Sequence, residues 1–213
     1  MNTDKFVINV GRQLGSGGRS IGQELAKRFS IKYYDRKLLE IASKQSGLNE
    51  KFFEEADEKA SKSLGGSGLF GSRFPFVADA ALFCGSNYLS NDELFKIQSD
   101  VIRDLANEES SLFVGRCADY ILRNHPRCIN VFVSASMDAR IKAFQSRNEN
   151  VTENQARDIL IKADKKRSTY YNYYSNKEWG VASTYHLCIE SSVLGLAKTT
   201  DFIESFIREK LGL

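Results

Sequence analysis

Cysteine, histidine and proline are scarce in this sequence, and their scarcity argues against several kinds of site. The four cysteines, Cys84, Cys117, Cys128 and Cys188, are widely scattered and form no C-x-x-C pair, so a zinc site is not expected. Neither of the two histidines has a serine, cysteine or carboxylate partner by spacing, which argues against a hydrolase triad. With only two prolines, regular and mostly helical structure is expected.

Long apolar runs and an excess of charge of one sign are also missing. No run reaches the length of a membrane-spanning helix and no signal peptide is recognisable, so we expect a cytoplasmic protein with reduced thiols and no membrane partner. The net charge of +3 is too small to argue for nucleic acid as a partner. The 213 residues, of which 42% are hydrophobic, suit one globular domain spanning residues 1–213.

The most informative pattern lies between Val7 and Phe29. An apolar run leads into a glycine-rich stretch, and apolar residues then recur at helical spacing. A strand, a glycine-rich turn and a helix in this order form a phosphate cradle, because glycine lets the backbone approach an anion and the helix start offers unpaired N–H groups. The usual pattern is G-x-x-x-x-G-K-[ST]. The chain matches its last three positions at Gly18, Arg19 and Ser20, with Arg for Lys, and has Gln13 for the first Gly.

This stretch predicts a site for ATP phosphates and Mg²⁺. The residues expected to bind the phosphates are Gly15, Ser16, Gly17, Gly18, Arg19 and Ser20. Arg19 keeps the positive charge of the usual lysine and can hold phosphate oxygens with two N–H groups at once. The Ser20 hydroxyl is the expected metal ligand.

The rest of the chain alternates predicted strands and helices. Strands are expected at 31–35, 111–114, 129–135 and 185–189. Helices are expected at 91–107, 118–123, 137–148, from a capping box at Thr152 to about 174, and from 193 to 211 with an interruption near Thr199–Thr200. This alternation predicts an α/β domain with a mostly parallel sheet and helices on both faces.

Charged residues follow the predicted second and third strands, at the sheet edge where such folds bind ligands. Asp35 ends the second strand, and Gly115-Arg116 follows the third with Asp119 one helical turn on. Each alone is more simply a cap or a surface charge, but their shared position favours a site. Asp35 or Asp119 could contact Mg²⁺ through water.

Two further segments have alternative interpretations. The helix after Thr152 concentrates cations around Asp164, with tyrosines following; it is either a solvated basic helix or a lid whose cations close over phosphates. Asp164 and Arg167 are three residues apart and share a face. The Gly/Ser/Phe-rich segment 61–76 is a surface loop, a homodimer contact or a segment that folds over substrate.

These pieces, in order, resemble the cytidylate kinase-like family of P-loop nucleoside monophosphate kinases. The resemblance is carried by GRQLGSGGRSIG, YYDRKLL, VGRCADYIL, VFVSASMDARI, DKKR with the following YY, and YHLCIESS. It implies a P-loop kinase fold with an acceptor-binding insert at about 36–90 and a helical lid at about 147–180. It also implies ATP and Mg²⁺ as cofactors and phosphoryl transfer to CMP or dCMP.

The resemblance also implies roles for individual residues. Arg19, Asp35, Arg116 and Arg167 are the expected catalytic residues; Asp35, Arg36, Arg116, Asp164 and Arg167 are the expected acceptor-binding residues. Cys117 replaces the aspartate of the family's Gly-Arg-Asp element, and Arg36-Lys37 replace Ser-Gly. These changes leave open a same-fold kinase with another small-molecule acceptor. The altered phosphate loop leaves open a nucleotide-binding regulatory protein without turnover. RNA or DNA binding through residues 162–167 is a weaker alternative.

Overall fold

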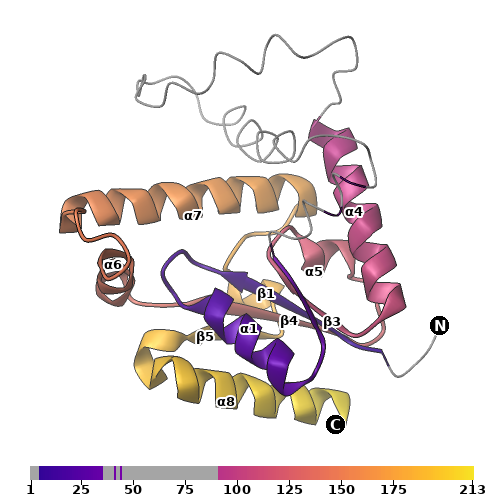
Figure 1. Ribbon diagram of the computed structural model, residues 1–213. Helices are drawn as coiled ribbons and strands as arrows, with labels where there is room; N and C mark the ends of the chain where they lie inside the picture. The colour runs from indigo at the N-terminus through magenta and orange to yellow at the C-terminus, as the bar shows by residue number, and fades with distance from the viewer. Residues whose placement is uncertain (1–4, 36–40, 42–43, 45–90) are drawn as a thin grey trace.

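The computed structural model describes residues 5–35, 41, 44 and 91–213 (Figure 1). Segment 61–76, Arg36 and nearly all of the predicted acceptor insert lie outside the described residues, so the predictions for them stay predictions. Within the described part of the chain, no helix has the combination of length and apolar character needed to cross a membrane.

A parallel sheet forms the centre of the fold, as the alternating pattern predicted. Its described strands are β1 (Val7–Arg12), β2 (Lys32–Tyr34), β3 (Ser111–Val114), β4 (Cys128–Ser134) and β5 (Leu187–Glu190). They are ordered β2-β3-β1-β4-β5, and every neighbouring pair is parallel. All strands therefore end at one edge, where the charged residues predicted to bind ligand were expected to gather.

Helices cover both faces of the sheet (Figure 1). On one face lie α1 (Gly18–Arg28) and α8 (Ser191–Leu211); on the other lie α4 (Asn91–Glu108), α5 (Ala118–Ile121) and α7 (Glu153–Ser175). Helix α6 (Met137–Gln145) lies at the start of α7, and a short 3₁₀ helix (Ala182–Thr184) precedes β5. Alternate residues of β1 serve the two faces: Ile8 packs in the core with α1 and α8, and Val7 packs in the core with α4.

Helix α7 begins as predicted, with a capping box between Thr152 and Gln155. The interruption predicted near Thr199–Thr200 is wrong: the departure from helical geometry in α8 occurs at Gly195, with φ 75° and ψ 164°. Thr200 is helical, and its hydroxyl donates to the Leu196 carbonyl oxygen at 2.8 Å, one turn back. Glycine adopts the left-handed conformation without a Cβ penalty, so the break falls there.

Candidate active site

The phosphate loop, residues 13–20, joins β1 to α1 and has the backbone geometry of an anion cradle. Gly15 and Gly17 have φ of 83° and 76°, which favour glycine. A Cβ on Gly17 would lie 2.3 Å from Leu196 Cδ2, so the Leu196 side chain would have to shift to admit one. The N-cap residue of α1 is Gly17, which has no side chain to cap the helix, and the Gly18 N–H donates to Ser16 Oγ at 3.4 Å. The start of a helix presents N–H groups without helical partners, here those of Arg19 and Ser20, which suit an anion.

The same loop is held on its other side by hydrogen bonds from neighbouring elements. Gln13, at the position where the pattern expects glycine, accepts a hydrogen bond from the Ala135 N–H at 3.1 Å through Oε1. The Ser191 hydroxyl, at the start of α8, donates to the Ser16 carbonyl oxygen at 2.6 Å. The replacement of glycine by Gln13 thus adds a link between the loop and the end of β4.

Arg19 and Asp35 meet, although they come from different elements. Arg19 Nε lies 2.8 Å from Asp35 Oδ2, and Arg12 Nη2 lies 3.8 Å from Asp35 Oδ1. Asp35 therefore sits between an arginine of the phosphate loop and an arginine at the end of β1. The Ser20 side chain is exposed in the first turn of α1.

A cavity of about 480 Å³ opens at the carboxyl edge of the sheet against α7. Its size is in the range of small-molecule sites. The lining residues from the strand ends are Asn9, Val10, Gly11, Arg12, Asp35, Gly115, Arg116, Cys117 and Asp119. Those from the predicted lid and the following segment are Ala163, Lys166, Arg167, Tyr170, Tyr171, Trp179 and Tyr185. Asp35, Arg116 and Arg167, which the sequence singled out separately, thus line one cavity.

Positive charge is concentrated in this cavity. Burial, then the neighbouring Arg167, lower the pKa of Arg12 to about 10, although Asp35 opposes the shift. Burial also lowers the pKa of Arg167, and Arg116 adds to the effect on both. Among the described lining residues, four are Lys or Arg and two are Asp. Mutually repelling cations favour an anionic ligand, because such a ligand relieves the repulsion.

The strand-to-helix turn at the cavity wall has an unusual backbone. Gly115, Arg116 and Cys117 have φ of 77°, 58° and 54°, so three consecutive residues are left-handed. Positive φ in a non-glycine residue costs energy and is often found at functional sites. A Cβ on Gly115 would lie 2.0 Å from Arg12 Nη1, so the glycine makes room for that guanidinium.

The other end of the cavity is aromatic. The Tyr171 hydroxyl donates to Asp119 Oδ2 at 2.6 Å, and burial raises the pKa of Asp119 above its ordinary value. Trp179 and Tyr185 both contact Phe132, with ring centroids 5.0 Å apart in each pair. Aromatic walls beside a cationic end suit a ligand that joins a planar ring to an anionic group.

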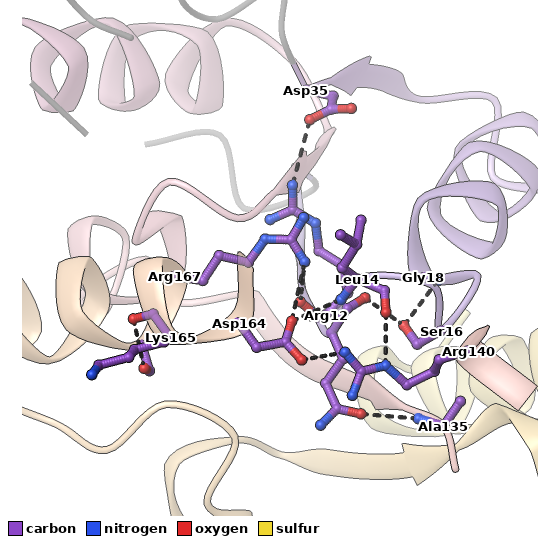
Figure 2. A network of polar contacts seen from close by, with 12 residues as sticks. Arg12, Leu14, Ser16, Gly18, Asp35, Ala135, Arg140, Asp164, Lys165 and Arg167 are labelled. Carbon is purple, nitrogen blue, oxygen red and sulfur yellow. Dashed lines mark hydrogen bonds and ion pairs between the residues drawn. The ribbon is translucent and has the colours of Figure 1, made fainter. Parts of the chain in front are cut away.

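Asp164 and Arg167, expected to act as a pair, face different surroundings (Figure 2). Arg167 lines the cavity and donates to the Arg12 carbonyl oxygen at 3.2 Å. Asp164 does not line it; Asp164 Oδ1 accepts a hydrogen bond from the Leu14 N–H at 2.9 Å. Their closest charged atoms are 3.7 Å apart, as the shared helix face predicted.

Arg12 and Arg140 were not identified as site residues from the sequence. Arg12 follows the same rule as Asp35 and Arg116, since it ends a strand. Lys166 belongs to the cations of the helix that one interpretation expected to close over phosphates, and it lines the cavity. Arg140 is buried within α6, and nothing in its neighbours' spacing indicates this.

The residues present fit a magnesium ion that arrives with a nucleotide. Within the described residues, no group of three or more His, Cys, Asp or Glu side chains could hold a metal alone. Mg²⁺ usually needs only one or two protein oxygens, because phosphates and water complete its shell. A hydroxyl at Ser20, beside an anion cradle, is a suitable donor.

The chain was compared with curated protein sequences, solved structures and protein-family models. No curated protein sequence matches it. A solved structure of an uncharacterized protein from Eubacterium ventriosum ATCC 27560 is 28% identical, with 95% of this chain and 98% of that chain covered and a TM-score of 0.68.

Two shikimate kinases share the fold at low identity. The enzyme from Bacteroides thetaiotaomicron is 11% identical, with 98% of this chain and 99% of that chain covered and a TM-score of 0.52. The enzyme from Acinetobacter baumannii, solved with shikimate, is 13% identical, with 97% of this chain and 95% of that chain covered and a TM-score of 0.50. The sheet and helices are therefore those of a P-loop kinase fold. The model of the cytidylate kinase-like family matches residues 7–193, and the chain belongs to that family.

Proposed function

We propose that the protein transfers the γ-phosphoryl group of ATP to a nucleoside monophosphate, CMP or dCMP. Family membership supports a phosphotransferase that acts on a small molecule. The observation that carries the finer proposal is the cavity where Arg12, Arg116 and Arg167 gather beside the phosphate loop. Its cationic end suits the acceptor phosphate, and its aromatic end suits a base.

The donor side needs little beyond the phosphate loop. The first-turn N–H groups of α1 and the Arg19 guanidinium would hold the phosphates of ATP. To reach the phosphates, the Arg19 guanidinium would either break its 2.8 Å contact with Asp35 or contact Asp35 and a phosphate at the same time. Its side chain is 58% exposed, so little packing opposes this movement.

On the acceptor side, catalysis needs positive charge and orientation of the acceptor more than it needs a side chain that removes a proton. A phosphate monoester has a second pKa of about 6, so it is largely ionised at neutral pH without help. Arg12 and Arg116 would hold it, and Arg167 would neutralise charge that develops during transfer. Asp35 would orient the acceptor by accepting a hydrogen bond. Bringing both phosphates together supplies most of the rate enhancement.

ATP and Mg²⁺ are the cofactors of this proposal. The Ser20 hydroxyl would hold the metal together with phosphate oxygens and water. Bound there, Mg²⁺ neutralises part of the phosphate charge.

A second acceptor class is favoured by one observation. Cys117 stands where the resemblance expects an aspartate, and Arg12 adds a cation to the same wall. A cavity richer in positive charge suits a more highly charged acceptor than CMP. The reaction would be the same, with another phosphorylated small molecule in the cavity.

A coupled assay of ADP release tests the proposal. Mg·ATP would be supplied with a panel of nucleoside monophosphates, and turnover is expected with CMP or dCMP. Arg19→Ala should abolish it, whereas Arg103→Ala, an exposed arginine of α4, should not. Turnover only with another phosphorylated acceptor would favour the second class. Binding of ATP without turnover on any acceptor would reject the kinase proposal in favour of a regulatory nucleotide-binding protein.

A further inference from the structure

Both backbone polar groups of Leu14, in the phosphate loop, are bound by side chains from other elements (Figure 2). The Leu14 N–H donates to Asp164 Oδ1 at 2.9 Å, and Arg140 Nε donates to the Leu14 carbonyl oxygen at 2.7 Å. Arg140 Nη2 also pairs with Asp164 Oδ2. The arginine of α6 and the aspartate of α7 thus hold the backbone of one loop residue between them, through the peptide units on either side of Leu14.

The arrangement is buried and closely packed. The side chains of Arg140 and Asp164 are 4% and 14% exposed. A Cβ on Gly15, the next loop residue, would lie 3.0 Å from the Arg140 carbonyl oxygen, so the loop also packs against the backbone of α6. Removing one partner of such a pair leaves a buried charge uncompensated, which is strongly unfavourable. The loop can leave this position only by breaking the two charge-assisted hydrogen bonds at Leu14.

The same contacts locate a cavity residue. Arg167 lies on α7 one turn after Asp164, 3.7 Å from its carboxylate, and donates to the Arg12 carbonyl oxygen. The position of α7 against the loop thus sets where the Arg167 guanidinium enters the cavity. The loop and the predicted lid are joined at Leu14, on the donor side of the site.

We propose that Arg140 and Asp164 are positioning residues of the donor site, which fix the phosphate loop through Leu14 and attach α7 to it. Asp164, in this proposal, does not bind the acceptor, which differs from what the family resemblance implies for it. The proposal rests on the proposed function for its effect on catalysis, but the loop contact itself does not depend on it.

Two variants test these roles. Asp164→Asn keeps the shape and an oxygen for the Leu14 N–H, but presents an amide N–H₂ to Arg140, where two donors meet. Arg140→Lys keeps the charge, but one ammonium cannot reproduce the planar fork that reaches both Leu14 and Asp164. Asp158→Asn, an exposed aspartate of the same helix, is the matched control.

The first measurement is binding and kinetics of the folded variants. We expect the Kd for Mg·ATP, measured by calorimetry, to rise about tenfold in Asp164→Asn and in Arg140→Lys. A tenfold rise corresponds to the loss of about one charge-assisted hydrogen bond. The KM for CMP should stay within about twofold of the unmodified chain, and Asp158→Asn should change neither value. A raised KM for CMP with an unchanged Kd for Mg·ATP would overturn the proposal and return Asp164 to the acceptor.

Hydrogen exchange of the chain without nucleotide separates this proposal from the kinase proposal. Exchange in a peptide spanning residues 11–20 should become about tenfold faster in both variants and stay unchanged in Asp158→Asn. Unchanged exchange in the two variants would overturn the proposal even if the protein is a kinase. Faster exchange in a protein that turns over no acceptor would support the loop contact and reject the proposed function.

Discussion

The phosphate loop and the neighbouring cavity are built in opposite ways. In the loop, side chains from α6, α7 and α8 bind backbone groups, and the buried Arg140 is paired with Asp164. In the cavity, burial lowers the pKa of Arg12 and of Arg167, and the neighbouring Arg116 adds to both shifts. The loop is fixed in position by contacts within the protein, whereas the cavity keeps an excess of positive charge.

The difference indicates how donor and acceptor would be recognised. A loop whose backbone is already fixed offers its N–H groups in place, so phosphate binding costs little ordering. A cavity of repelling cations gains stability from an anion, so it selects by charge. Asp35 lies between the two regions, in contact with Arg19 on one side and Arg12 on the other.

The largest expected effect is at Gly17, on the loop side. Gly17→Ala places a side chain on a backbone with φ of 76°, which strains the loop, and the new Cβ also displaces the Leu196 side chain. We expect affinity for Mg·ATP, measured by calorimetry, to fall at least about 100-fold, equivalent to about 2.7 kcal/mol. Gly212→Ala is the control, because it has φ of 65° with nothing within 4 Å. An equal loss of affinity for Mg·ATP in the two variants would contradict the role of the loop in binding the phosphates.

The next effect should fall on the cavity alone. Gly115→Ala would place a Cβ 2.0 Å from Arg12 Nη1 and displace that guanidinium from the cavity. We expect the KM for CMP to rise about 30-fold, or about 2 kcal/mol, while the Kd for Mg·ATP stays unchanged. Arg12→Lys, which leaves Gly115 intact, should raise the KM in the same direction. A loss of ATP affinity in either variant would show that the two regions are not separate.

Asp35→Asn should affect both regions at once, by a smaller amount. The amide cannot compensate Arg19 and Arg12 as the carboxylate does, so both arginines lose an ion pair. We expect about tenfold lower kcat/KM for the acceptor together with a changed Kd for Mg·ATP. Steady-state kinetics and calorimetry measure the two effects. A change confined to one substrate would place Asp35 in one region only.

The smallest effect concerns stability at the aromatic end of the cavity. Tyr171→Phe removes the hydroxyl that donates to Asp119 at 2.6 Å and leaves a buried carboxylate oxygen without that donor. The free energy of unfolding should fall by about 1 kcal/mol in denaturant titrations at pH 7. Tyr173→Phe, on the same helix and 54% exposed, should have little effect. Equal stability of both variants would contradict a structural role for the hydrogen bond.

The pH dependence of this variant has a defined sign. Burial in the folded state raises the pKa of Asp119 above its ordinary 3.8. Its contribution to the free energy of unfolding is therefore most favourable below pH 3.8, where the carboxyl is protonated in both states, and is lost as pH rises through the raised pKa. The Tyr171 hydrogen bond opposes the rise, so Tyr171→Phe should extend this loss to higher pH. Asp119→Asn should remove this pH-dependent contribution to the free energy of unfolding altogether.

Local patterns in the sequence predicted the loop after β1, helix α1 and the start of α7. The glycines of the phosphate loop, the helix after them and the capping box of α7 depend on neighbouring residues, which periodicity and turn chemistry can detect. The gathering of Asp35 and Arg116 followed from one rule, that parallel strands end at one edge. The predicted position of the break in α8, near Thr199–Thr200, was wrong, because the backbone leaves helical geometry at Gly195, where positive φ carries no Cβ penalty.

What the sequence could not supply depends on distant contacts. Arg140 has the spacing of an ordinary helix residue, and only its approach to Leu14, 126 positions earlier, shows its use. Asp164 and Arg167 share a helix face, but which of them enters the cavity depends on how α7 packs against the loop. Whether Arg19 meets a carboxylate likewise depends on the sheet order that brings Asp35 near it.

Trp179 makes the cavity convenient to observe. It is the one tryptophan in the 213-residue sequence, and it lines the cavity while contacting Phe132 edge to face. The protein's tryptophan emission therefore comes from a single indole in the cavity wall. A shift in its emission wavelength or quantum yield would report an acceptor entering the cavity, without a label and without turnover.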